Sequence, residues 1–145
     1  MARTSSDIVI SAEPDEILSV IADFAAYPDW ATGVRSADVK SEANGMPEVV
    51  HFVLDAAPIR DEYDLSYVWD GSRSVSWTLS GAGSMLKAMD GSYQLVPTDD
   101  GTRVTYQLTV DVSIPMLGML KRKAEKVVID TALKGLKRRV EALRD

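Results

Sequence analysis

Apolar residues near the C-terminus recur with the spacing of a helix. Across residues 115–145 they return every three or four positions, and no proline follows Pro115. Proline fits the first turn of a helix, where its missing N–H has no helical partner. The pattern predicts one long amphipathic helix whose apolar stripe contains Leu117, Leu120, Ala124, Val127, Val128, Ile129, Thr131, Ala132, Leu133, Leu136, Val140 and Leu143. Because a lone helix of this length needs a partner surface, the upstream segments must cover it.

Those upstream segments alternate apolar and polar residues, which is typical of strands with one buried face. Turn signals such as Asn44-Gly45 and Asp70-Gly71 separate them. Asp90-Gly91 predicts a bulge or a bend within one strand. The seven predicted strands are residues 4–11, 34–41, 48–55, 60–69, 74–80, 85–97 and 102–112.

Two short helices are predicted between the first and second strands. Residues 14–23 begin with Pro14 and place Asp15 and Glu16 at the positive end of the helix dipole. Residues 24–30 are rich in aromatics, and Pro28 breaks any continuous helix, so a short helix or turn packing three rings inward is expected. Hairpin-linked strands make an antiparallel sheet. The fold class is therefore α+β: a curved seven-stranded antiparallel sheet around a long C-terminal helix, in a single domain of residues 1–145.

Composition narrows the functional classes. The chain of 145 residues has no cysteine, which excludes disulfides and thiolate sites. Residues 1–7 are polar and no window reaches the length of a membrane span, so we expect a soluble, cytoplasmic protein with no integral membrane association. The net charge of −6 argues against nucleic-acid binding. Residues 116–145 nevertheless carry nine Lys and Arg against four Asp and Glu, so this basic helix could meet an acidic partner.

The predicted architecture leaves space to fill, because one helix cannot cover the inner face of seven strands. A cavity between sheet and helix is the expected result. The element order resembles the START-like helix-grip superfamily, most closely its bacterial polyketide cyclase/dehydrase and coenzyme-Q-binding branch. The resemblance spans nearly the whole chain and is carried by residues 11–17, 22–30, 91–97, 101–106 and 133–137. It implies a hydrophobic pocket for a lipid, sterol, quinone or polyketide, in a carrier or a cyclase.

Aromatic residues at alternate positions of neighbouring strands are the pocket candidates. They either line a cavity or fill a solid core. The expected ligand-binding residues are Tyr63, Tyr67, Trp69, Trp77, Tyr93, Tyr106, Met116 and Leu120, and the expected gate consists of Tyr27, Trp30 and Met119.

Catalytic groups are sparse in the sequence. Asp61 alternates with Tyr63 and could point inward, where burial would raise its pKa. His51 is the only histidine, and it is either a proton-transfer group or an ordinary strand residue. No phosphate loop, nucleophile elbow or metal-ligand spacing occurs, so no cofactor and no metal are predicted.

The sequence therefore predicts a domain that binds or carries a small hydrophobic ligand. Two alternatives stay open. One is a polyketide cyclase/dehydrase-type enzyme that uses Asp61, Tyr63 or His51. The other is a protein-interaction module that uses the basic helix face at Lys121, Lys123 and Lys126. The oligomeric state is not predicted.

Overall fold

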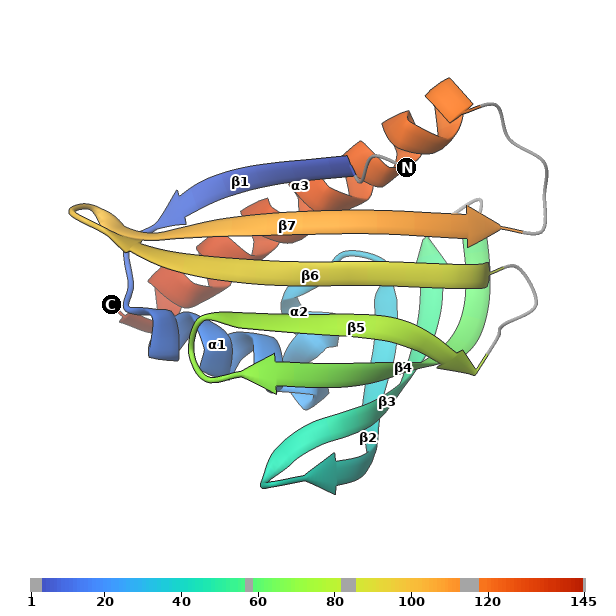
Figure 1. The fold of residues 1–145 in the computed structure, drawn as a ribbon, viewed down its shortest axis with the longest axis horizontal. Coiled ribbons are helices and arrows are strands. Elements are labelled where there is room, and N and C mark those ends of the chain that lie inside the picture. Colours follow the sequence, from blue (N-terminus) through green and yellow to red (C-terminus); the bar gives the residue numbers. More distant parts are fainter. Residues whose placement is uncertain (1–3, 57–58, 82–85, 113–117, 145) are drawn as a thin grey trace.

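The computed structural model describes residues 4–56, 59–81, 86–112 and 118–144 (Figure 1). The elements follow the predicted order and include a 3-10 turn, η1. They are β1 (Thr4–Ile10), α1 (Pro14–Ala22), η1 (Phe24–Ala26), α2 (Tyr27–Trp30), β2 (Val34–Ala43), β3 (Met46–Ala56), β4 (Ile59–Asp70), β5 (Ser74–Gly81), β6 (Leu86–Thr98), β7 (Gly101–Val112) and α3 (Gly118–Arg144). The predicted α+β class is confirmed.

All seven strands form one antiparallel sheet in the order β1-β7-β6-β5-β4-β3-β2. The strands from β2 to β7 follow one another as hairpins, and β1 joins at the far edge beside β7. Asn44 and Gly45, between β2 and β3, have φ of 56° and 78°. Two successive positive φ values characterise the tight hairpin turn that Asn-Gly predicts.

The helices lie together on one side of this sheet (Figure 1). The main contacts of α3 are with β1, β7 and α1, whereas those of η1 and α2 are with β2, at the opposite edge. The helices therefore contact mainly the two edges of the sheet, with α3 at the β1–β7 edge and η1 and α2 at the β2 edge. Large side chains must fill the space between these elements.

The long C-terminal helix is confirmed, and its predicted start at Pro115 lies outside the described residues. Its buried side chains are Ile129, Leu133, Leu136 and Val140, with Glu125 on the same line. Five members of the predicted stripe are instead exposed: Ala124, Val127, Val128, Thr131 and Leu143. Each residue of an α-helix turns the chain by roughly 100° about the helix axis. When Ile129 faces the sheet, Val127 and Val128 therefore point in other directions and stay exposed.

Polar side chains tie α3 to the sheet along its length. The buried Glu125 carboxylate accepts hydrogen bonds from Thr4 Oγ1 at 2.6 Å and from Val110 N at 2.7 Å. Near the other end, Lys137 Nζ donates to Val9 O at 2.7 Å. A buried carboxylate is tolerable here because both of its oxygens accept a hydrogen bond.

Gly91 does not mark a bulge. Pairing between β6 and β7 runs without a shift through Asp90↔Thr109 and Gly91↔Leu108, and the register shift lies between Leu86 and Ala88. A Cβ on Gly91 would overlap the ring of Trp77, which lies across it from β5. Glycine is needed at this position because an indole ring packs on the backbone.

No helix among the described residues is long and apolar enough to cross a membrane.

Replacing Gly91 by Ala should lower the free energy of unfolding by about 1–3 kcal/mol, because the added methyl group meets the Trp77 ring. Urea denaturation measures this change. In the Trp77→Phe background the same substitution should cost clearly less, since a smaller ring leaves room. An equal cost in both backgrounds would contradict the proposed overlap.

Candidate functional site

The inner face of the sheet carries an aromatic wall, defined here as Phe52, Tyr63, Tyr67, Trp69, Trp77, Tyr93 and Tyr106. Strand alternation puts these rings on one face, and the antiparallel register sets them side by side, as in the pairs Tyr67↔Trp77 and Tyr93↔Tyr106. The ring centroids of these pairs are 5.6 Å and 4.6 Å apart. Trp77 also lies 5.5 Å from Tyr106. The sheet brings together all six aromatic residues that the sequence nominated as ligand-binding.

Two residues on the helical side face this wall. Phe24 of η1 is buried, with its ring 5.0 Å from Tyr67 and 5.9 Å from Phe52. Tyr27 is also buried, and its hydroxyl donates to the Ile21 carbonyl. That hydrogen bond holds Tyr27 to the end of α1. Trp30 is half-buried with its ring 4.9 Å from Tyr27, and its backbone lies close to Gly135 of α3.

The tyrosine hydroxyls of the wall have no protein partner among the described residues. Tyr63, Tyr67, Tyr93 and Tyr106 form no hydrogen bond there, in contrast to Tyr27. Each of these tyrosine residues keeps a relative exposure of 6–8%, whereas nearby Val75 and Val104 have none. None of the four hydroxyls is a fully buried atom without a partner, as Trp30 Nε1 and Ser92 Oγ are, so each borders space that a water molecule can enter. These four therefore suit a water or a ligand oxygen in the interior.

Burial raises the pKa of Tyr67, Tyr93 and Tyr106 far above that of an ordinary phenol, and neighbouring tyrosines raise it further. For Tyr63, burial comes first and the negative charge of Asp61 second in raising the pKa. All four hydroxyls are consequently neutral near pH 7. A neutral phenol donates a hydrogen bond and does not act as a base.

Asp61 is buried on the inner side of β4, next to Tyr63. Its Oδ1 accepts from Glu62 N and its Oδ2 from Leu86 N, each at 2.9 Å. The carboxylate thereby joins the start of β4 to the start of β6, two strands away. This position agrees with the inward orientation that alternation predicts, and any catalytic role of Asp61 stays a prediction.

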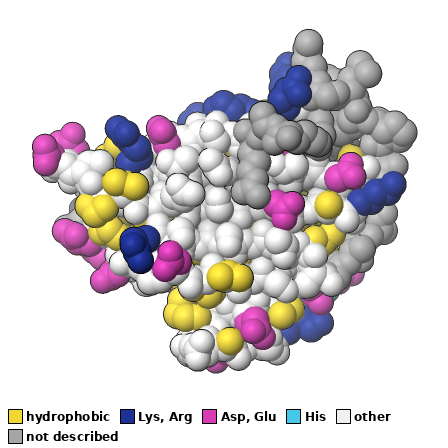
Figure 2. Space-filling view, in the orientation of Figure 1, with side chains coloured by type: hydrophobic (Ala, Val, Ile, Leu, Met, Phe, Trp, Pro, Cys, Tyr) yellow, Lys and Arg dark blue, Asp and Glu magenta, His cyan; other side chains and the backbone are white. Residues whose placement is uncertain are grey.

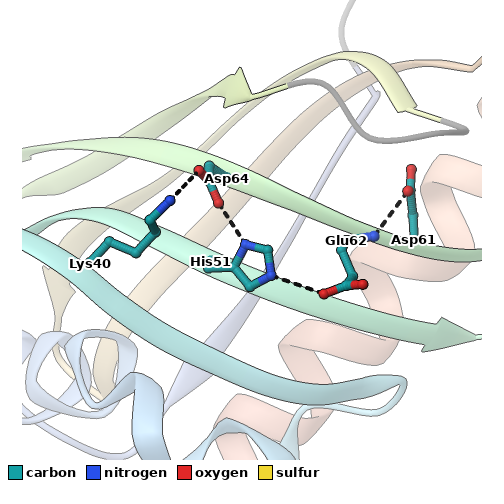
Figure 3. A network of polar contacts seen from close by, with 5 residues as sticks. All are labelled: Lys40, His51, Asp61, Glu62 and Asp64. Carbon is teal, nitrogen blue, oxygen red and sulfur yellow. Dashed lines mark hydrogen bonds and ion pairs between the residues drawn. The ribbon is translucent and has the colours of Figure 1, made fainter.

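His51 lies on the outer face of the sheet, opposite the aromatic wall (Figure 3). Its Nδ1 is 2.7 Å from Asp64 Oδ1, its Nε2 is 3.2 Å from Glu62 Oε1, and Lys40 Nζ donates to Asp64 Oδ2 at 3.0 Å. These contacts raise the pKa of His51, the Asp64 hydrogen bond most and the Glu62 bond next. The contacts with Asp64 and Glu62 give His51 a structural role on the outer face. The sheet separates its ring from the interior.

The remaining predicted residues fall outside the described side chains: Met116, Met119, Leu120 and, on the basic face, Lys121. No group of three or more His, Asp or Glu suited to a metal occurs within the described part of the chain.

A surface depression of about 610 Å³ lies between the start of α1 and the β6–β7 hairpin. Its walls include the carboxylates of Glu13, Asp99, Asp100 and Glu141. Such an acidic, open surface is unsuited to an apolar ligand and is separate from the aromatic wall. Sequence reasoning did not single it out, because its residues come from turns far apart in the chain.

Comparisons with known proteins agree with the fold. The family model for polyketide cyclase/dehydrase and lipid transport matches residues 1–141. A START superfamily protein from Mycobacterium smegmatis has a TM-score of 0.90 at 21% identity, with 97% of this chain and 98% of that chain covered. A protein from Thermus thermophilus has a TM-score of 0.83 at 22% identity, covering 99% and 100%. These identities show the fold alone.

An enzyme is among the similar structures. The Zhui aromatase/cyclase from a Streptomyces species has a TM-score of 0.75 at 15% identity, with 97% of this chain and 93% of that chain covered. No curated protein sequence matches the chain.

The outer-face network predicts a pH dependence of stability. The folded pKa of His51 is raised above its ordinary 6.5, so its contribution to stability is complete below the unfolded pKa. The contribution disappears as the pH rises through the folded pKa. His51→Ala should therefore destabilise the protein more at about pH 5.5 than at about pH 8.5 in urea denaturation.

Glu62→Gln is the matched control for this experiment. It removes the weaker of the two carboxylate contacts and should leave most of the pH dependence in place. An equal effect of His51→Ala at both pH values would rule out the charged pair with Asp64.

Proposed function

The chain belongs to the polyketide cyclase/dehydrase and lipid transport family, and from this premise we propose that its interior binds a small hydrophobic molecule against the aromatic wall. The proposed ligand lies between β4–β7 and α3. The observation that carries the proposal is the set of four tyrosine hydroxyls without a partner among the described residues, within an otherwise apolar face. Ligand pockets are typically apolar and contain a small number of precisely positioned polar groups.

The character of this wall supports a particular class of ligand. Burial of apolar surface supplies affinity at about 25 cal/mol per Å², whatever the chemistry of the ligand. Neutral tyrosines then select molecules with carbonyl or hydroxyl oxygens that accept hydrogen bonds. Flat rings at centroid separations of 4.6–5.6 Å suit a planar molecule that packs against them. Quinone-like and polyketide-like molecules meet both conditions better than a saturated acyl chain does.

The hydrogen bonding and protonation of the polar side chains favour ligand binding over catalysis. The Asp61 oxygens already accept two backbone N–H groups, Tyr63 is held neutral, and His51 is on the outer face. No described group facing the interior is therefore poised as a base. The second candidate function is a cyclase that works by holding a reactive chain in a productive fold, and the position of Asp61 next to Tyr63 on the inner face keeps this alternative open.

Quenching of tryptophan fluorescence by menadione, a small naphthoquinone, tests the proposal. Trp77 lies within the wall, so we expect saturable quenching by the wild-type protein. Tyr93→Phe and Tyr106→Phe keep the rings and remove the hydroxyls, and each should weaken binding by about 5–10-fold. Unsaturable quenching, or full affinity in both variants, would refute binding at the wall.

Tyr27→Phe is the matched control, because it also removes one tyrosine hydroxyl. Its hydroxyl already donates to Ile21, so the variant should lose stability and keep its affinity for menadione.

Native mass spectrometry of protein purified without detergent then identifies a co-purified molecule. A carrier releases a supplied poly-β-ketone chain unchanged, whereas a cyclase closes a ring in it with loss of water, which lowers its mass.

A further inference from the structure

One side of α3 faces away from the sheet and is apolar and basic. We define this outer face of α3 by its exposed residues Lys123, Ala124, Val127, Val128, Thr131, Lys134 and Arg138. Val127 and Val128 have relative exposures of 60% and 50%. Neighbouring valines exposed to this extent on a helix gain stability if another apolar phase covers them.

The described carboxylates of α3 form no ion pair with the cations of this face, although the charge of Lys134, after the hydrogen bond from Lys126, contributes to lowering the pKa of Asp130. Glu125 is buried against β1 and β7, Asp130 pairs with Lys126 at 2.8 Å, and Glu141 pairs with Lys137 at 2.9 Å. Glu125 bonds Thr4 of β1, and Glu141 accepts a hydrogen bond from Ser11 N just beyond that strand. Lys123 and Arg138 form no ion pair with any described residue. Figure 2 shows the side on which the sheet lies in front of α3, with Lys and Arg side chains visible along its upper edge; the outer face of α3 points away from this view.

We propose that the outer face of α3 docks on an anionic lipid surface, with Val127 and Val128 inserted and Lys123, Lys134 and Arg138 over the head groups. An apolar strip flanked by Lys and Arg on one helix face is the pattern of interfacial helices. Each such cation near an anionic surface adds to the attraction. The remaining chain, residues 1–115, carries eighteen Asp and Glu against seven Lys and Arg. This charge asymmetry orients α3 toward the lipid and the acidic strands away from it.

Other occupants fit the outer face of α3 less well. A symmetric contact with a second copy would bring the same three cations together across the interface. A globular partner would need about 800 Å² of matched surface on each side, and a single convex helix presents only a narrow ridge. A fluid lipid surface deforms around such a ridge and needs only a few inserted side chains.

Co-sedimentation with vesicles tests the docking. The wild-type protein should bind vesicles of phosphatidylcholine with about 30% phosphatidylglycerol at low salt, should bind pure phosphatidylcholine weakly, and should dissociate at about 0.5 M NaCl. The double variant Lys123→Glu/Lys134→Glu should bind at least about tenfold less. Val127→Ser/Val128→Ser should bind several-fold less at the same charge.

Two control variants match these changes elsewhere on the surface. Lys87→Glu/Arg103→Glu changes the net charge equally on exposed strand positions, and Val68→Ser/Val96→Ser removes two valines with exposures of 68% and 56%. Both should bind like the wild type. No binding to anionic vesicles, or equal losses in test and control variants, would overturn the proposal. Menadione binding is measured separately, so failure of the docking leaves the interior site untouched.

Discussion

The rest of the structure depends on the way one helix covers a sheet wider than itself. Helix α3 packs against β1 and β7, while η1 and α2 approach β2, so the inner face between them must be filled by side chains. Small residues would leave voids there, because protein interiors pack to high density. The large rings of β4 to β7, with Phe24 opposite, meet this demand and form the aromatic wall. The candidate site is thus a consequence of the packing problem.

The attachment of α3 explains both faces of that helix. Its buried line of Ile129, Leu133, Leu136 and Val140 supplies apolar contact, and polar bridges from Glu125 and Lys137 fix its position along β1. The side of α3 that faces away from the sheet carries Lys123, Lys134 and Arg138 beside the exposed Val127 and Val128. The way α3 packs on the sheet therefore sets both the proposed ligand-binding interior and the proposed lipid-facing surface.

The electrostatics of the interior favour recognition over proton transfer. Burial keeps the tyrosine hydroxyls protonated, and Asp61 is engaged by backbone N–H groups between β4 and β6. The one histidine belongs to a charged network on the outer face with Asp64 and Glu62. Polar groups that already hold the sheet together are poorly placed to change protonation during a reaction. The same fold occurs in an aromatase/cyclase from a Streptomyces species, so the fold by itself does not decide between binding and catalysis.

The sequence by itself determined the strands, the hairpin turns, the long helix and the face to which each aromatic residue belongs, because alternation and turn chemistry are local properties. The inward placement of Asp61 followed from the same alternation. Only the tertiary structure decided which sector of α3 meets the sheet, and it buried Glu125 while exposing Val127 and Val128. It also decided that Gly91 accommodates the Trp77 ring and that His51 pairs with Asp64. Each of these depends on a neighbour from another element, which hydrophobic periodicity within one segment does not specify.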